Sequence, residues 1–195
     1  MKQFFNFLLF CAALPLFADV MLAPGASVTD GIMKFRNDES FAQERNSAKF
    51  SVEKGITISA AVRLNKRPPI TGSGFDEKGK IVFQHDFIAG KGKSFAFGRR
   101  SDSWVDQMYI NFFNGEKWCV PLTKAATTPP YGQWAIWAVT LEPQFRREEG
   151  RKFTVVTLFI NGEAQYRAEV DGLPAASDDP VRWAQGVGID GKKWV

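Results

Sequence analysis

Residues that could act as nucleophiles or general bases are few. The 195-residue chain has one histidine, His85, and two cysteines, Cys11 and Cys119. A cysteine or serine nucleophile needs a base beside it, and no serine or cysteine is placed by its context to partner His85. Cys119 lies in an alternating run, as a small buried hydrophobic residue would. We therefore expect His85, at the end of an apolar strand, to be structural and Cys119 to be a buried thiol.

Two further patterns suggest phosphate or polyanion chemistry but do not meet its requirements. Gly90–Ser94 reads Gly-Lys-Gly-Lys-Ser, yet Phe87 stands where a phosphate-binding loop needs its first glycine, and no helix follows. Arg99–Arg100 and Arg146–Arg147 are short basic pairs in predicted loops with acidic neighbours. Lys and Arg total 25 against 21 Asp and Glu, for a net charge of +4. This charge does not form the clustered basic face that a nucleic-acid partner needs, so none is predicted.

The elements that would position any site are predicted to be β-strands. In Ile56–Leu64 every second residue is apolar, the pattern of a strand with one face on a core. Similar runs follow at 80–84, 94–98, 107–113, 116–120, 133–141, 153–160 and 163–170, with shorter candidates at 32–35, 49–52 and 185–189. Asp38–Lys49 is polar and is predicted to be a loop, as is the charged stretch Pro143–Lys152. The 18 Phe and 6 Trp residues also favour pleated, half-buried surfaces.

Two Asn-Gly pairs, Asn114–Gly115 and Asn161–Gly162, stand between alternating runs. Both residue types tolerate positive φ, which the two-residue turn of a hairpin requires. About ten short strands joined by Pro- and Gly-rich segments predict an all-β fold of two packed antiparallel sheets, a β-sandwich.

Residues 1–18 have the pattern of an export signal: a lysine, an apolar run from Phe4 to Ala18, and a small residue at the end. The run is shorter than the ~20 residues needed to cross a bilayer. We expect cleavage after Ala18, a secreted, periplasmic or cell-surface protein without a transmembrane segment, and one domain over residues 19–195. Cleavage would remove Cys11 and leave Cys119 without a disulfide partner.

Three segments, in order, resemble strands of the laminin G-like group of concanavalin A-type lectin/glucanase sandwiches, common in secreted bacterial proteins. They are Gly55–Arg63 (GITISAAVR), Gly132–Thr140 (GQWAIWAVT) and Val156–Ala164 (VTLFINGEA). The resemblance spans roughly residues 30–190 and implies a jelly-roll sandwich. It also matches Trp134 to the family's core tryptophan, which leaves Trp137 facing outward or into the second layer.

The chain departs from this family at several positions. Ala61 stands where the family usually has tryptophan, and Ala135–Ile136 replaces its histidine pair. Gln185–Gly191 resembles the glycine-rich strand near the family's end, but no counterpart of its last strand follows. We expect either a sandwich lacking that strand, as in a fragment of a longer protein, or a fold completed differently. Unpaired edges would then favour marginal stability or a pairing partner.

The resemblance implies non-catalytic binding, most plausibly of a glycan, or adhesion to a neighbouring protein surface. The candidate ligand-binding residues are Trp104, Tyr131 and Asp102 at the loop rim, because a flat ring can stack on the apolar face of a sugar. Trp118 and Trp183 are further stacking candidates. Core packing is the alternative interpretation for each of these aromatic residues.

Calcium is the one metal that the resemblance suggests. Sandwiches of this family often hold Ca²⁺ at the loop rim, and the ion asks only for several oxygen ligands. Asp76, Asp86 and Asp106 are the candidate metal ligands, with Asp102 beside them. Their spacing is irregular, so solvated surface carboxylates are the alternative.

Glycoside hydrolases on this kind of sandwich carry acids spaced Glu-x-Asp-x-x-Glu on one strand, a pattern that this chain lacks. Glu148–Glu149 and Asp178–Asp179 are predicted to be solvated turns. A hydrolase is thus the less favoured alternative, and a structural or protein-interaction fragment of a larger surface protein or carbohydrate-active enzyme is the other.

Overall fold

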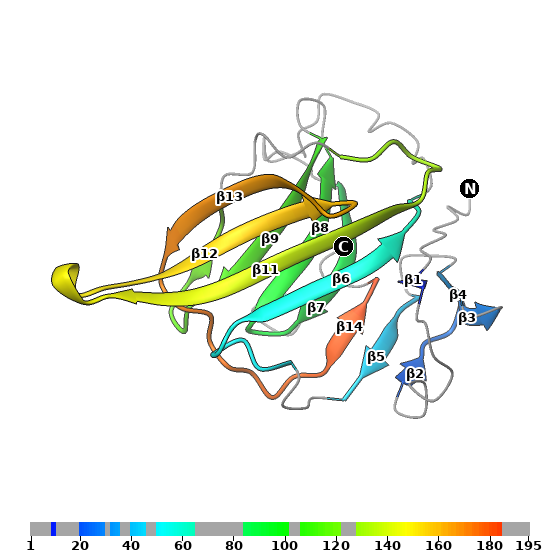
Figure 1. Cartoon of the computed structure of the whole chain (residues 1–195). Coiled ribbons are helices and arrows are strands. Elements are labelled where there is room, and N and C mark those ends of the chain that lie inside the picture. Colours follow the sequence, from blue (N-terminus) through cyan, green and yellow to red (C-terminus); the bar gives the residue numbers. More distant parts are fainter. Residues whose placement is uncertain are drawn as a thin grey trace, which may run out of the picture.

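The computed structural model describes residues 9–10, 20–29, 32–35, 40–45, 50–64, 84–101, 106–121 and 128–184. Nearly all regular structure in these residues is β, and every paired strand is antiparallel (Figure 1). The all-β fold predicted from the alternating pattern is confirmed.

A four-stranded sheet forms one layer, in the order β13-β12-β11-β6. Its strands are β6 (Ile56–Val62), β11 (Ala135–Arg146), β12 (Arg151–Ile160) and β13 (Glu163–Asp171). Alternate residues of β11 point inward, so Trp137, Val139 and Leu141 are all buried. The outer face of this sheet carries the residues between them.

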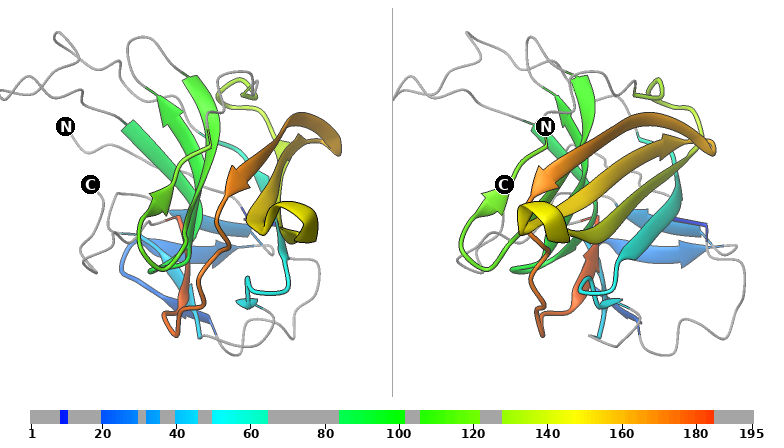
Figure 2. Two further views of the ribbon diagram at one scale, coloured as in Figure 1. Left: turned by 90° about the vertical axis from the view of Figure 1, so that its left-hand side faces the viewer. Right: turned by 60° about the vertical axis from the view of Figure 1, so that its left-hand side comes forward.

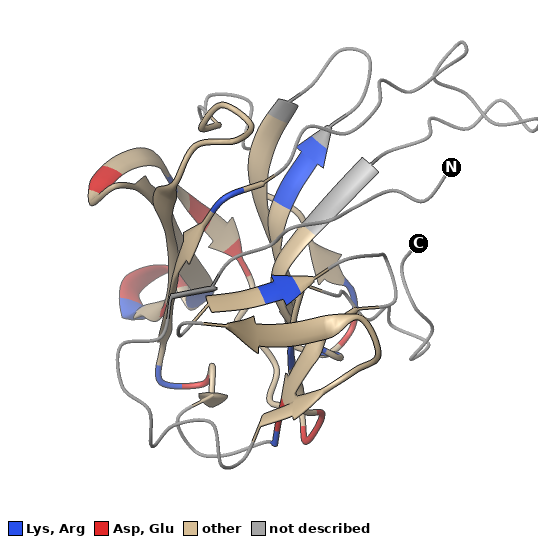
Figure 3. Cartoon of the chain, turned by 90° about the vertical axis from the view of Figure 1, so that its right-hand side faces the viewer, with Lys and Arg blue, Asp and Glu red and all other residues tan. Residues whose placement is uncertain are grey.

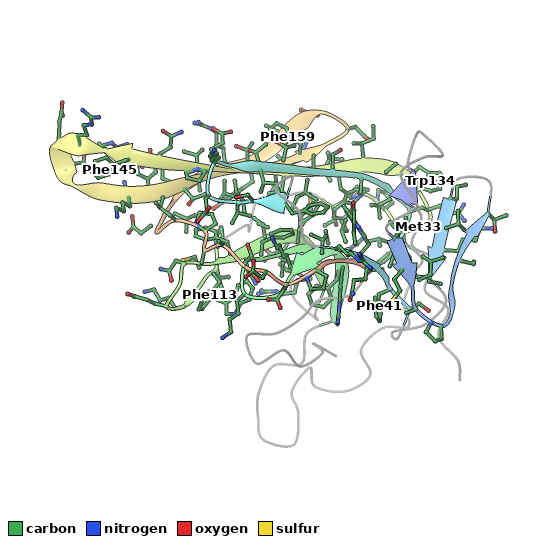
Figure 4. All side chains as sticks on the ribbon, turned by 90° about the horizontal axis from the view of Figure 1, so that it is seen from below. Met33, Phe41, Phe113, Trp134, Phe145 and Phe159 are labelled. Atoms are coloured by element: carbon green, nitrogen blue, oxygen red, sulfur yellow. The ribbon has the colours of Figure 1, made fainter. Side chains whose placement is uncertain are left out.

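A seven-stranded sheet forms the second layer, in the order β10-β9-β8-β7-β14-β5-β2. Its strands are β2 (Val20–Leu22), β5 (Ala42–Glu44), β7 (Gln84–Lys91), β8 (Phe95–Ser101), β9 (Asp106–Phe113), β10 (Trp118–Cys119) and β14 (Val181–Trp183). Phe97, Ile110 and Phe112 of this layer are fully buried against the four-stranded sheet. The two layers are seen edge-on in Figure 2 and from below in Figure 4, so the predicted two-sheet sandwich is confirmed.

A three-stranded sheet, ordered β1-β4-β3, lies at one end of the sandwich (Figure 1). It consists of β1 (Leu9–Phe10), β3 (Ala26–Thr29) and β4 (Ile32–Phe35). Met33 and Phe35 of β4 belong to the common core, at 2% and 1% exposure. Because β1 falls inside the predicted export signal, its pairing with β4 would be a feature of the uncleaved chain.

Several strand predictions are wrong in extent. β5 lies inside 38–49, which was predicted to be a loop, because Ala42 packs into the core and β14 pairs with it. A strand was predicted at 80–84, with His85 at its end. β7 instead continues to Lys91, so His85 is the second residue of β7. Arg99 and Arg100 belong to β8 and Arg146 to β11, so these basic residues do not lie in loops. These strands form because they pair with neighbouring strands in the sheet, and the local sequence does not reveal that pairing.

The two Asn-Gly segments both join hairpin strands, but their turns differ. Asn161 (φ 52°) and Gly162 (φ 84°) form the predicted two-residue turn between β12 and β13. Between β9 and β10, Phe113 pairs with Trp118, so the loop has four residues instead of two. There the Asn114 Oδ1 accepts hydrogen bonds from the Glu116 and Lys117 amides, at 3.0 and 2.9 Å.

The stretch predicted as the charged loop 143–152 is a long hairpin. β11 and β12 stay paired from Trp137–Ile160 to Arg146–Arg151, and a 3-10 turn at Arg147–Glu149 closes the end. Gly150 takes φ 61° at its C-terminus. The hairpin extends beyond the rest of the sheet (Figure 1).

Candidate functional site

Of the three main candidate ligand-binding residues and the three candidate metal ligands, the structure describes the side chain of Tyr131 alone. Trp104, Asp102 and Asp76 lie outside the described residues. The main chain of Asp86 lies in β7, opposite Arg99 of β8, and that of Asp106 opens β9, opposite Ser101. Among the described residues, no group of three or more His, Cys, Asp or Glu could hold a metal ion.

Tyr131 lies in the segment that crosses from one sheet to the other at the rim. The guanidinium carbon of Arg99 lies 3.9 Å from the centre of the Tyr131 ring, and Arg99 Nη1 donates to the Pro129 carbonyl at 3.1 Å. On the other side, the Gly132 amide donates to the Leu64 carbonyl at 2.7 Å. Tyr131 is half-buried and part of its ring is covered by Arg99, so its main role is to tie the rim together.

The exposed aromatic surface of this rim belongs to Trp134, three residues further on. Its exposure is 43%, whereas Trp137 is 2% exposed and lies in the core. The match of Trp134 to a core tryptophan is therefore wrong. Ala135 pairs with Val62 and both point inward, which places Trp134 on the outer face and Trp137 on the inner one.

Four residues make a patch around this indole, which we call the Trp134 patch: Ala61, Arg63, Trp134 and Ile136. Ile136 pairs directly with Ala61, and Arg63 lies with its guanidinium carbon 5.8 Å from the centre of the Trp134 ring. Ile136 is 52% exposed. Ala61 carries only a methyl group beside Ile136, and Arg63 is the large side chain next to the indole. Figure 4 shows Trp134 at one end of the four-stranded sheet and Phe145 at the other.

The β12–β13 turn anchors this end of the sheet. The Ile136 amide donates to Asn161 Oδ1 at 2.8 Å, and the Asn161 amide donates to the Ile136 carbonyl, also at 2.8 Å. Asn161 therefore has two roles: its positive φ allows the turn, and its hydrogen bonds with Ile136 fix the start of β11. Its side chain holds the main chain on which Trp134 and Ile136 stand.

Charge on the same sheet is concentrated in the far hairpin. Arg146 bonds Glu149 and Glu169, and Arg151 bonds Glu169 at 2.9 Å and Asp171 at 2.7 Å. The hydrogen bond to Asp171 raises the pKa of Arg151, with smaller contributions from Glu169. Both guanidinium carbons also lie 5.0 Å from the centre of the Phe153 ring. In the view of Figure 3, charged residues lie mainly at strand ends and turns.

The outer face of the seven-stranded sheet carries aromatic residues that are not open to solvent. Phe87, Ala96 and Tyr109 form a second buried cluster with Trp118 against it, and the Phe87 and Tyr109 rings meet edge to face at 6.2 Å. Among the described residues, the buried side-chain oxygens of Gln107 and Asn111 on the same strand have no hydrogen-bond partner. Trp118 and Trp183 are half-buried. None of these rings offers the exposed flat face that Trp134 does.

Two predictions about isolated reactive groups can be tested here. Cys119 is buried as predicted, and burial raises the pKa of its thiol. Asp179, predicted to be in a solvated turn, is exposed, and it also accepts hydrogen bonds from the Lys93 amide at 3.2 Å and the Ser177 hydroxyl at 2.6 Å. Gly90 and Lys91 therefore belong to β7, and residues 92–94 form the β7–β8 turn, held by Asp179.

The sequence contained a usable signal for the patch. Trp134, Ile136 and Ala138 are alternate residues at the start of β11 and point to the same side of it. Ala61 and Arg63 are alternate residues at the end of β6 and likewise share one side. The alternation thus places them on one outer face, but only the pairing register sets Trp134 beside Arg63. No described helix is long and apolar enough to cross a membrane.

Neither a protein-family model nor a curated protein matches the sequence. The structure defines the class of the protein as an all-β sandwich. Its most exposed described tryptophan lies beside an arginine on the outer face of one sheet.

Proposed function

We propose that the chain is a secreted, non-catalytic binding module of the laminin G-like, jelly-roll type, and that its ligand is a glycan held on the Trp134 patch. Export rests on the leader pattern in residues 1–18. The family rests on the three strand segments that resemble it. Two of these, around β6 and β11, supply the patch itself.

The observation that carries the proposal is the exposed indole. A tryptophan at 43% exposure on a flat sheet leaves apolar ring surface in water, although burying such a ring is favourable. The apolar face of a pyranose fits this surface, and polar groups beside it fix the orientation of the sugar. Arg63 and the exposed Gln133 are the polar groups within reach along the chain.

Catalysis is not part of the proposal, because three carboxylates described on this sheet are engaged in other bonds. Glu169 and Asp171 each bond an arginine, and Glu142 accepts from the Thr140 hydroxyl at 3.3 Å. Glu142 and its neighbours border a shallow, open depression of about 300 Å³ lined by Lys54–Thr57 and Thr140–Gln144. A pair of acids facing one another, as glycoside hydrolysis needs, does not line it.

The test is a glycan array followed by calorimetry on the purified chain, with and without calcium. Wild type is expected to bind at least one glycan class, and Trp134→Ala to reduce that binding about tenfold or more, by analogy with nucleobases, whose stacking on an aromatic side chain is worth roughly 1–3 kcal/mol. Phe145→Ala is the matched control, because Phe145 is another exposed aromatic (54%) at the far end of the sheet. Binding that is absent in wild type, or lost equally in Phe145→Ala, would contradict the proposal.

Adhesion to a protein surface is the second candidate, favoured by the 52% exposure of Ile136 beside Trp134 and Arg63. Tryptophan and arginine dominate protein–protein hot spots, and an aliphatic side chain contributes little to sugar stacking. Ile136→Ser separates the two candidates. Glycan binding is expected to survive this substitution, whereas a protein contact centred on the patch is expected to weaken.

A further inference from the structure

The Trp134 patch contains a positive charge without a counter-charge. In the part of the chain that the structure describes, Arg63 makes no hydrogen bond or ion pair, and its buried Nε has no acceptor. Its contact is with the Trp134 ring, at a distance that allows a cation–π interaction. A guanidinium held in this way keeps its donors available for a ligand.

The arginines at the opposite end of the same sheet differ in this respect. Arg146 and Arg151 are bonded to carboxylates at 2.7–3.3 Å, so their charge is already neutralised. Arg167, also on the outer face, pairs across the ladder with Thr157 and is not beside an exposed ring. Arg63 alone among these combines a charge without a carboxylate partner with an exposed aromatic platform.

We infer that the Trp134 patch takes the carboxylated residue of an acidic glycan, a hexuronic acid. The pyranose ring stacks on Trp134 and its carboxylate accepts two parallel hydrogen bonds from Arg63. Guanidinium and carboxylate match in this planar geometry, and the charged bonds are about twice as strong as neutral ones. Ala61, opposite Ile136, adds only a methyl group to this face. The inference rests on the proposed function and specifies its ligand class.

The experiment compares one sugar chain in two charge states. Calorimetry on the full chain uses oligogalacturonides and their methyl esters, which keep the ring and lose the carboxylate charge; oligomers of glucuronic and mannuronic acid extend the panel. Wild type is expected to bind at least one acidic oligomer about tenfold or more tightly than its ester. Arg63→Gln should remove most of the preference for the acid, weakening binding of the acid far more than that of the ester.

Two further variants control for charge and for stacking. Arg147→Gln removes the same charge from the exposed 3-10 turn at the far end of the sheet, and is expected to preserve the preference. Trp134→Ala should weaken acid and ester alike. Added salt should weaken binding of the acid more than that of the ester.

The possible failures are distinguishable. If wild type binds the ester as tightly as every acid, or if Arg63→Gln keeps the preference, the inference is overturned while glycan binding stands. If wild type binds neither acids nor neutral glycans, the proposed function fails as well. Circular dichroism of each variant shows whether the sandwich is intact.

Discussion

The guanidinium of Arg99, a residue only 2% exposed, lies 3.9 Å from the centre of the half-buried Tyr131 ring. Arg99 stands on β8 of one sheet, and the segment carrying Tyr131 is bonded through Gly132 to Leu64 beyond β6 of the other. The pair therefore closes the rim of the sandwich just ahead of Trp134.

Tyr131→Ala is expected to lower the free energy of unfolding by about 2 kcal/mol, because it removes a half-buried ring and exposes a buried cation to a void. Urea unfolding measures this change. Tyr131→Phe keeps the ring under Arg99 and should lose less than half as much. Equal losses in the two variants would show that the stacking contributes nothing.

The two tryptophans of β11 should differ sharply on truncation. Trp137→Ala is expected to cost about 3–5 kcal/mol, as for a fully buried aromatic residue, and Trp134→Ala less than about 0.5 kcal/mol, as for a surface site. Trp137→Phe gives a milder loss should the alanine variant not fold. If Trp134→Ala lost more stability than Trp137→Ala, the assignment of Trp137 to the core would be contradicted.

Asn161 is expected to tolerate aspartate but not alanine. Asn161→Ala loses the acceptor for the Ile136 amide and puts at φ 52° a residue that tolerates the left-handed region less well than asparagine, for a cost of about 2 kcal/mol. Asn161→Gly relieves the backbone and should cost about half of that. Asn161→Asp retains the acceptor and should stay near wild type. Thermal unfolding that ranked glycine below alanine would rule out this explanation.

Gly92 and Asp179 should behave as a coupled pair. A β-carbon at Gly92 would overlap the Asp179 carboxylate, which holds the Lys93 amide and the Ser177 hydroxyl. Gly92→Ala is expected to cost about 1–2 kcal/mol through loss of these bonds. In an Asp179→Gly background, which removes the Asp179 β-carbon as well as the carboxylate, the same substitution should cost close to nothing, and a double-mutant cycle measures the difference. Additive costs would contradict the contact.

The Cys119 thiol should make stability fall at alkaline pH. Burial raises its pKa above the ordinary value of 9.0, so the unfolded chain releases this proton first as pH rises. The contribution is fully present below pH 9 and is lost above it. Unfolding measured from pH 7 to 10.5 should show a steeper decline for wild type than for Cys119→Ala. In a Cys11→Ser background, thiol reagents should label Cys119 only as the chain unfolds.

Much of the fold could be predicted from alternation, since one buried face imposes a period of two on each strand. Ile58, Ala60 and Val62 are buried as their spacing predicted, and Asn161–Gly162 forms the expected turn. β5 and β14 could not be predicted, because each has three residues and exists through its pairing partners on either side. For such short strands the neighbours, and not the local residues, decide the structure.

The candidate site divides in the same way. Trp104, Tyr131 and Asp102 were predicted to form a ligand-binding site at the rim. Tyr131 does lie at a rim, but its ring is stacked on Arg99 and has a structural role. The patch that the structure exposes instead combines Trp134 with Arg63, 71 residues apart in the chain. Alternation alone left open which of Trp134 and Trp137 is buried, because either parity is compatible with a strand.

By itself, the sequence determined that this chain is all-β, that its strands have one apolar face, and where the two Asn-Gly hairpins turn. These properties follow from residue types and from spacing along one strand. Only the tertiary structure decided that Trp134 faces outward, that Arg63 lies beside it, and that Asp179 holds the β7–β8 turn. Each of these depends on the register between strands or on a contact between distant segments, and a shift of one residue would reverse which face every side chain occupies.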